Sequence, residues 1–379
     1  MTLMSILATP FGYLVPFIVA LTIIVFIHEL GHFLVARWCG VTVEAFSIGF
    51  GKEIFGWVDK HGTRWKVCWL PLGGYVKFEG DANPASLPQA TLDPETVRSP
   101  GNFHGKPIWK RAAVVAAGPI ANFLLAIVIF ATVYAVVGVQ LLEPRVAEFT
   151  EGSAAEKAGM RSGDVITAVN GNRTETFNDL VRAVWNKGGE QLKISITRNG
   201  TPIDLGIVPE IKEESDGFGG TFKRGLLGIK PVQATSDTPV RRLSIPAAIA
   251  KGGEETWRII SVTMKFLGKL VVGQENSKQL GGAISIAKGA GDAASGGGLS
   301  FGGFIAFLSV SVGLINLFPI PMLDGGHLVY YAIEAVLGKP LGQQAQEWGF
   351  RVGLSLVVML MAFGFWNDLS RIFTVITGS

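Results

Sequence analysis

Four long stretches of the chain contain no charged residue, and they constrain its fold more than any other feature. They cover residues 1–27, 112–142, 299–323 and 352–367. A helix that crosses a bilayer needs about 20 largely apolar residues, so four helical spans fit, the last of them short. With 48% hydrophobic and 17% charged residues, the 379-residue chain falls in the membrane class.

The net charge of +3 is too small to indicate nucleic-acid binding, and no dense run of Lys and Arg is present. The two cysteines, Cys39 and Cys68, have no CxxC spacing and predict neither a disulfide framework nor a zinc ribbon. No Lys or Arg precedes Arg37, whereas several follow it before the second span. The positive-inside rule therefore predicts an external N-terminus, a cytoplasmic segment 38–110 and an external segment 143–298.

The first span contains three ionisable side chains, His28, Glu29 and His32, within "TIIVFIHELGHFLVARW". Such groups are costly inside a bilayer and mark a functional site. The two histidines are four residues apart, so they share one face of a helix and can bind one Zn²⁺, with Glu29 beside it as a base. The alternative is a pair of histidines on one helix that only hydrogen-bond to each other. This alternative leaves the buried Glu29 unexplained.

A catalytic zinc ion commonly has three protein ligands and a water. The segment "NLFPIPMLDGGHL" (316–328) offers Asp324 and His327 after prolines that break the third span. Irregular backbone at membrane depth is tolerated only where protein or a watery cavity surrounds it. Taken alone, Asp324 reads as an ordinary Asp-Gly turn residue. We favour it over His327 as third ligand, because two histidines and a carboxylate form a known catalytic set.

The segment between the second and third spans contains one compact α+β domain. "AGMRSGDVITAVNG" (158–171) predicts a turn and a strand, "TFNDLVRAVWNKGG" (176–189) a helix, and "QLKISITRNG" (191–200) a further strand. The domain resembles a PDZ domain. The resemblance implies a peptide-binding loop at Leu226, Leu227, Gly228 and Ile229. Strand addition of a peptide and a role as a rigid obstacle both remain open.

Residues 64–78, "RWKVCWLPLGGYVKF", alternate in polarity and predict a hairpin strand beside the membrane, with its turn near Pro71, Gly73 and Gly74. Residues 82–102 predict a loop. Residues 255–273 predict an interfacial amphipathic helix, and residues 292–303 a flexible lead into the third span.

An HExxH motif in a first span, followed by N-x-x-P-x-P-x-L-D-G-G in a later one, resembles the site-2 proteases, which are intramembrane zinc metalloproteases. "FHGKPIWKRAAVVAAGPIANF" (103–123) and the C-terminal "RVGLSLVVMLMAFGFWNDLSR" (351–371) resemble the RseP (regulator of sigma-E protease) branch in a single-PDZ form. The resemblance implies that His28, His32 and Asp324 bind zinc, that Glu29 is the base and that Asn316 helps to hold the substrate backbone. The best-known members differ in carrying two PDZ domains, and "GGAISI" (281–286) and Ser311 depart from the family pattern.

The predicted fold class is a polytopic α-helical membrane protein with about four transmembrane helices, a membrane-associated β-hairpin region and one inserted α+β PDZ domain. The predicted segments are a first span with HELGH (1–37), the hairpin region and loop (38–110), a second span (111–142), the PDZ domain (143–232), a linker with an amphipathic helix (233–298), a third span with LDGG (299–323), a cytoplasmic loop (324–350) and a fourth span (351–369).

The predicted function is zinc-dependent cleavage of single-span membrane proteins in the bacterial inner membrane, with the PDZ domain periplasmic and the active site near the cytoplasmic side. The resemblance implies an anti-sigma factor after a first cut, or remnant signal peptides, as substrate. A catalytically idle PDZ membrane scaffold is the main alternative, and intact HELGH argues against it. A metal-dependent transporter predicts internal repeats, which the sequence does not show.

Overall fold

The computed structural model describes residues 3–80, 99–140, 142–215, 221–232, 239–273 and 280–377. The chain divides into two compact units. The first comprises Met1–Ala131 and Ala248–Asp368, and the second comprises Thr132–Ala247 and Leu369–Ser379.

Four helices in the described part of the chain are long and apolar enough to cross a membrane, which confirms the expected number of spans. They are α1 (Leu3–Trp38), α3 (Ile108–Thr132, continued by the π-helical turn η1, Val133–Val137), α8 (Gly298–Asn316) and α10 (Gln343–Thr377). Helix α8 ends well before residue 323, because Pro319 and Pro321 follow it and cannot continue a helix.

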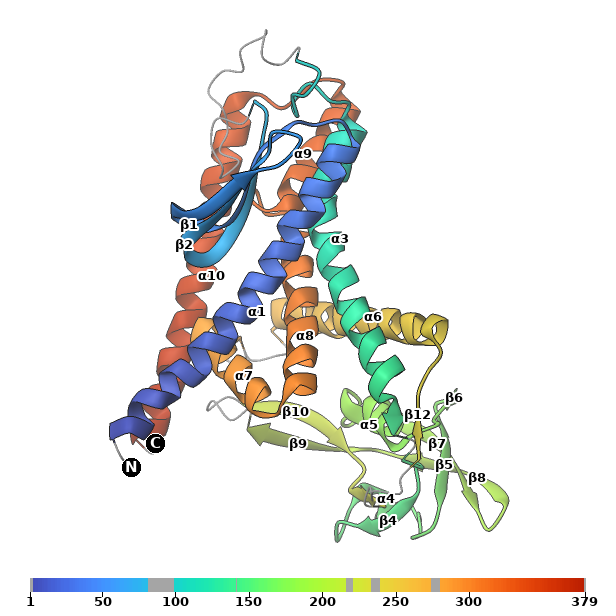
Figure 1. Ribbon diagram of the computed structural model, residues 1–379. Helices are drawn as coiled ribbons and strands as arrows, with labels where there is room; N and C mark the ends of the chain where they lie inside the picture. The colour runs from blue at the N-terminus through green and yellow to red at the C-terminus, as the bar shows by residue number, and fades with distance from the viewer. Residues whose placement is uncertain are drawn as a thin grey trace. The chain divides into compact units, whose positions relative to one another are not determined.

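Figure 1 shows α1 and α3 meeting near the top of the view and diverging below, with α8 between them in the first unit. Helices α1 and α3 approach closely at Gly31, where an added Cβ would lie 2.4 Å from the carbonyl oxygen of Ala117. Only glycine allows this approach. Helix α3 also packs against α8. Ala126 of α3 and Ala306 and Val310 of α8 are fully buried in one cluster, so small and branched side chains meet there.

The hairpin of strands β1 (Val43–Val58) and β2 (Arg64–Phe78) lies against α1 (Figure 1). Its turn is at residues 59–63, where the amide of Asp59 donates to the carbonyl of Thr63 and Gly62 has a φ of 86°. The chain changes direction again between residues 67 and 74, because 64–67 and 74–77 run in opposite directions along 45–48. Pro71 and Gly73, the predicted turn residues, lie in this bend within β2. Glycine adopts a positive φ without steric strain, so Gly62 suits its place in the turn at residues 59–63.

Both hairpin strands bend and pair more than once. Residues 45–48 pair with residues 64–67 and also with residues 74–77, while residues 55–58 pair with 64–67. The two strands thus form four paired segments, of which 74–78 is an outer one. Stacked aromatic rings of Phe46 and Trp65, 4.4 Å apart, anchor the hairpin beside Phe33 of α1.

The segment 324–350, predicted as a cytoplasmic loop, is largely helical. It contains α9 (Asp324–Leu337) and the first turns of α10. Helix α9 forms because its Tyr331 packs against the core cluster around Phe46 and its Glu334 makes a bidentate ion pair with Arg111 at 2.5 and 3.1 Å. These contacts join residues far apart in sequence, so the local pattern did not reveal them.

Two further helices lie between the second and third spans. Helix α6 (Ile245–Val271) begins before the predicted residue 255, and its apolar residues Ile249 and Trp257 are exposed. Helix α7 (Ala283–Ser295) replaces part of the predicted flexible lead. The carboxylate of Asp368 in α10 accepts hydrogen bonds from the amides of residues 282 and 284 and so caps α7. Residues 233–238 and 274–279 of the predicted linker lie outside the described residues.

The second unit has α+β architecture. Its main sheet has the strand order β6-β5-β7-β8, formed by Asn172–Arg173, Val165–Val169, Leu192–Arg198 and Thr201–Ile207. Strand pairs β11-β4 (Ile229–Pro231, Val146–Phe149) and β10-β9 (Thr221–Leu226, Glu210–Ser215) accompany it, with the short helix α4 (Ala154–Lys157). Helix α5 (Phe177–Trp185) begins with a capping box formed by Thr176 and Asp179.

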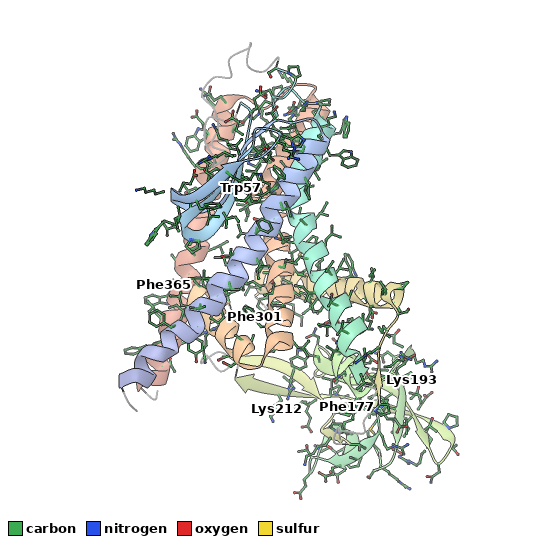
Figure 2. The ribbon with its side chains drawn as sticks, in the orientation of Figure 1. Trp57, Phe177, Lys193, Lys212, Phe301 and Phe365 are labelled. Carbon is green, nitrogen blue, oxygen red and sulfur yellow. The ribbon has the colours of Figure 1, made fainter. Side chains whose placement is uncertain are left out.

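The core of this unit is apolar and its outer face is charged. Phe177 of α5 and Ile194 of β7 are buried, whereas Lys193 on the alternate face of β7 is exposed (Figure 2). The buried carboxylate of Asp164 pairs with Arg198 at 2.8 Å, and this hydrogen-bonded guanidinium holds the pKa of Asp164 below its usual range. Strands β3 (Val139–Gln140) and β12 (Val240–Arg241) pair where the chain enters and leaves the unit.

Candidate metal centre

Two histidines of α1 face the same point. His28 and His32 are one helical turn apart, their rings meet edge to face with centroids 4.8 Å apart, and their Nε2 atoms are 3.2 Å apart. Both are largely buried, with 8% of His28 exposed. Apolar residues of "TIIVF" before them and "FLVARW" after them keep the helix unbroken through the motif.

Asp324 meets both histidines from α9. Its Oδ2 lies 3.1 Å from His28 Nε2, and its Oδ1 lies 3.6 Å from His32 Nε2. The three ligand atoms all lie within 4.8 Å of one another. The structure therefore brings together three side chains that the sequence separates by almost three hundred positions.

The chain reverses sharply between α8 and α9, and this reversal places Asp324 beside His28 and His32. An added Cβ at Gly325 would lie 2.3 Å from the carbonyl oxygen of Leu317, and one at Gly326 would lie 2.4 Å from that of Ile320. Met322 has a φ of 87°, which is unusual for a residue with a side chain. The two glycines are required because α9 begins in direct contact with the backbone that follows α8.

Helix α3 packs against the rings of His28 and His32. An added Cβ at Gly118 would lie 2.3 Å from His32 Nε2 and 2.8 Å from His28 Nε2, so only glycine leaves room for the rings. The Nδ1 atom of His32 donates to the carbonyl oxygen of Val114 at 2.8 Å, and His28 Nδ1 lies 3.2 Å from the amide of Asn122. These outer contacts set the orientation of both rings.

Glu29 lies beside the three converging side chains, at the edge of the hairpin. It is near enough to interact with the charges of His28, His32 and Asp324, and it accepts a hydrogen bond from the backbone amide of Val76. At Gly74 an added Cβ would lie 3.1 Å from Glu29 Cγ. The outer hairpin segment 74–78 therefore runs next to the predicted base.

The donor set fits a divalent zinc ion. Two imidazole nitrogens and a carboxylate are a known catalytic zinc set, which leaves a fourth position for water or substrate. Asp324 Oδ2 is buried and, apart from His28, has no hydrogen-bond partner among the described residues. A buried carboxylate oxygen without further partners is costly, and a bound cation would satisfy it.

The other predicted site residues take different places. Asn316 is the last residue of α8 and is half-buried. His327 lies in α9 with its ring 6.3 Å from that of Tyr330, and it is not one of the three converging side chains. Leu226 to Ile229 lie in the second unit, where Leu227 is buried in the core and Gly228 has a φ of 73°.

Three residues of α3 were missed by reasoning from the sequence alone: Val114, Gly118 and Asn122. The signal available was "GPIAN", in which an amide side chain stands inside an apolar span. Its partners could not be read from the sequence, because the contact with α1 joins residues 94 positions apart.

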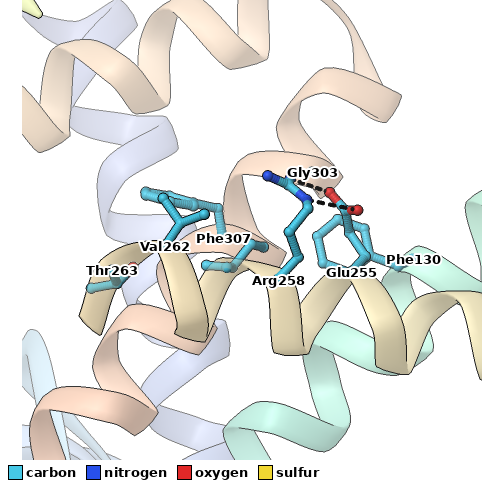
Figure 3. Close-up of a pocket in the computed structure, with 8 residues that line it drawn as sticks. Phe130, Glu255, Arg258, Val262, Thr263, Gly303 and Phe307 are labelled. Atoms are coloured by element: carbon cyan, nitrogen blue, oxygen red, sulfur yellow. Dashed lines mark hydrogen bonds and ion pairs between the residues drawn. The ribbon is translucent and has the colours of Figure 1, made fainter. Parts of the chain in front are cut away.

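Two cavities lie away from the histidines. One of about 260 Å³ lies between α3, α6 and α8, lined by apolar side chains and the ion pair of Glu255 with Arg258 (Figure 3). A second of about 460 Å³ lies in the second unit beside Thr174 and Arg241. Neither is lined by the three converging side chains, so neither marks the place of the predicted chemistry.

Comparison with known proteins identifies the family. The sequence model of peptidase family M50 matches residues 16–360. The chain belongs to peptidase family M50. Its members are the site-2 proteases, so the chain is a zinc-dependent metalloprotease of the membrane, and the expected enzyme class and cofactor are confirmed.

Relatives of this M50 peptidase match along almost their whole length. A protein of Agrobacterium fabrum whose name describes a zinc metalloprotease is 45% identical over 363 residues, covering 95% of this chain and 96% of its own. Metalloprotease MmpA of Caulobacter vibrioides is 40% identical over 382 residues, covering 94% and 95%. Protease RseP of Yersinia pestis is 32% identical over 458 aligned positions, covering 95% and 98%, and thus has residues without a counterpart here.

Proposed function

We propose that His28, His32 and Asp324 bind the zinc ion of this peptidase and that Glu29 is its general base. The observation that carries the proposal is the convergence of the three ligand atoms within 4.8 Å, beside a carboxylate held at a hairpin edge. A bound zinc ion supplies Lewis acidity, which polarises a carbonyl group and acidifies water.

In the proposed hydrolysis, Glu29 moves the proton. Its carboxylate accepts a proton from the attacking water and returns it to the nitrogen of the scissile bond as the carbon–nitrogen bond breaks. The amide of Val76 orients the carboxylate by its hydrogen bond. Gly118 leaves the histidine rings room to keep their positions.

We propose that the hairpin segment 74–78 holds the substrate in an extended conformation. This segment is an outer one in the hairpin and runs past Glu29. An unwound segment of a membrane protein can add to such an edge by backbone hydrogen bonds, which is β-augmentation. Asn316, at the end of α8, is proposed to contact the backbone of the same substrate.

We infer that the substrates are single-span proteins of the bacterial inner membrane, of the anti-sigma-factor type after a first cut, or remnant signal peptides. The similarity to protease RseP of Yersinia pestis supports this assignment. The second unit is proposed to be a single PDZ domain on the periplasmic side, with the zinc near the cytoplasmic side. An idle scaffold is not favoured, because it needs neither Glu29 nor the three converging side chains.

Replacing Glu29 with Gln tests the proposal. We expect bound zinc to remain near the wild-type level while cleavage of a membrane-span substrate falls by at least about 10²-fold, since proton transfer is lost and coordination is not. Metal content is measured by elemental analysis and cleavage by electrophoresis. Glu254→Gln, at an exposed ion pair with Lys251 in α6, is the matched control and should cleave normally. Near-normal turnover of Glu29→Gln would remove Glu29 from the mechanism.

A further inference from the structure

A buried amide of α3 faces the first histidine of α1. Asn122 is completely buried, and its Nδ2 lies 3.2 Å from His28 Nδ1. The contact is made on the side of the ring opposite Nε2, which faces Asp324. Asn122 therefore cannot touch a metal or a substrate at the site, yet a membrane span retains its polar group at a cost.

The two histidines have outer partners of different kinds. The partner of His32 Nδ1 is the carbonyl oxygen of Val114, at 2.8 Å. A carbonyl oxygen only accepts hydrogen bonds, so His32 carries its hydrogen on Nδ1 and keeps the lone pair of Nε2 available for a metal. The partner of His28 Nδ1 is a side-chain amide, which offers a donor at one end and an acceptor at the other.

When a metal binds His28 Nε2, the Nδ1 atom of His28 must face the acceptor of the Asn122 amide, which is Oδ1. With Nε2 as ligand, Nδ1 carries the hydrogen and must donate it. The acceptor of the amide, Asn122 Oδ1, is buried and has no hydrogen-bond partner among the described residues. Nδ2 and Oδ1 are similar in size, so a half-turn of the amide exchanges them without changing its shape. Oδ1 then takes the position opposite His28 Nδ1.

Contacts from α8 hold Asn122 in place for this role. Ser309 of α8 donates from its hydroxyl to the backbone carbonyl of Asn122 at 2.9 Å. At Gly313, one turn further along α8, an added Cβ would lie 3.2 Å from Asn122 Cβ. The side chain can turn about its last bond, but it cannot swing away from His28.

We propose that Asn122 is a positioning residue that holds the tautomer and ring orientation of His28 for metal binding. Its NH₂ group donates to Nδ1 in the metal-free protein, and its Oδ1 accepts from Nδ1–H when Nε2 binds zinc. This inference rests on the proposed function, because it takes His28 as a ligand. Asn122 orients His28 as the carbonyl of Val114 orients His32. The carbonyl can only accept a hydrogen bond and therefore fits one tautomer of His32, whereas the amide of Asn122 can pair with either tautomer of His28.

The test compares Asn122→Leu and Asn122→Asp in the purified full-length protein. Leucine keeps the approximate volume and removes both polar groups, whereas aspartate keeps an acceptor. Zn²⁺ affinity is measured by competition with a chelator, and ligand geometry by the visible absorption spectrum after Co²⁺ loading. We expect Asn122→Leu to bind Zn²⁺ about 10–100-fold more weakly with an altered Co²⁺ spectrum. Asn122→Asp should bind Zn²⁺ at least as tightly as the wild type.

Ser311→Ala is the matched control, because it removes a hydroxyl hydrogen bond to the carbonyl of Phe307 within α8 and leaves Asn122 and its contacts intact. It should keep wild-type affinity and spectrum. Wild-type binding by Asn122→Leu, weak binding by folded Asn122→Asp, or equal losses in all three variants would overturn the inference. If Asn122→Leu does not fold, the Zn²⁺ affinity of Asn122→Asp alone decides between the inference and its rejection. His28→Ala tests the ligand set separately: unchanged Zn²⁺ binding in that variant would overturn the proposed function itself.

Discussion

Asp324 reaches the histidines of α1 because two glycines follow it and allow α9 to start against the backbone after α8. His327 lies one turn further along the same helix, and its ring contacts Tyr330 instead. Neighbouring residues of one short motif thus have different surroundings. The choice between them as third ligand is therefore a matter of a few ångströms, and it can be tested with single substitutions.

We expect Asp324→Ala to lose zinc and cleavage together, because it removes one of three ligands and leaves two imidazoles. His327→Ala should keep most of both, since it leaves the three converging side chains in place. Zinc stoichiometry and cleavage rate are measured on the same preparations. The opposite pattern would make His327 the ligand and Asp324 a turn residue.

Among the helices, α10 packs against the segment that leads to Asp324. Gly353 of α10 is buried, and an added Cβ there would lie 1.8 Å from the carbonyl oxygen of Pro321. At Gly349, one turn earlier, an added Cβ would lie 3.6 Å from Pro321 Cβ. The position of Asp324 therefore depends on how closely α10 packs against the Pro-x-Pro segment, although α10 carries none of the predicted site residues.

Gly353→Ala should shift Pro321 and with it Asp324. We expect a destabilisation of about 1–3 kcal/mol from overpacking, together with weaker Zn²⁺ binding. Gly303→Ala in α8 is the matched control, since an added Cβ there meets nothing within 4 Å. Thermal unfolding and chelator competition are measured on both. If both variants bind zinc like the wild type, α10 does not position the loop.

For the whole molecule, the second unit is joined to the rest of the chain by a narrow connection. Val240 pairs with Gln140 and Arg241 with Val139, so the chain enters and leaves the unit side by side. This pairing means that the unit can be excised with a short linker and little strain at the ends. Its proposed task is to screen substrates through the predicted peptide-binding loop Leu226 to Ile229.

Deleting residues 144–232 with a short linker should therefore broaden the range of membrane proteins cleaved without abolishing zinc-dependent cleavage. The measurement is proteomic comparison of cleaved substrates in cells that carry the full or shortened chain, each with its Glu29→Gln counterpart as the inactive control. An unchanged substrate range would rule out screening by this unit.

The proposed topology places the second unit and the turn after α9 on opposite sides of the membrane. The site supports it, because HELGH near the end of α1 meets the residues that follow the end of α8, so both helices reach the same depth at their C-terminal ends. A cysteine at exposed Thr201 should react with an impermeant reagent in cells with a permeabilised outer membrane, and one at exposed Lys339 should not. The buried Cys39 and Cys68 give the background. Equal labelling would contradict this topology.

The sequence by itself determined the four spans and the histidine pair, because both are local properties. An uncharged run must satisfy its backbone within a helix in lipid, and residues four apart on a helix meet without help from the rest of the chain. The motif pair also indicated the zinc chemistry and predicted Asp324 as a zinc ligand, through resemblance to the site-2 proteases. The α+β architecture of the second unit was predicted in outline from its alternating strands.

Tertiary structure alone decided the rest. The hairpin turns at residues 59–63 and again between residues 67 and 74, because residues 45–48 pair with both 64–67 and 74–77. Residues 324–337 are helical because Glu334 pairs with Arg111 of α3. Asn122 meets His28 only because Gly31 and Gly118 let α1 and α3 approach closely. Each of these outcomes depends on contacts between residues distant in sequence, whose energies no local pattern contains.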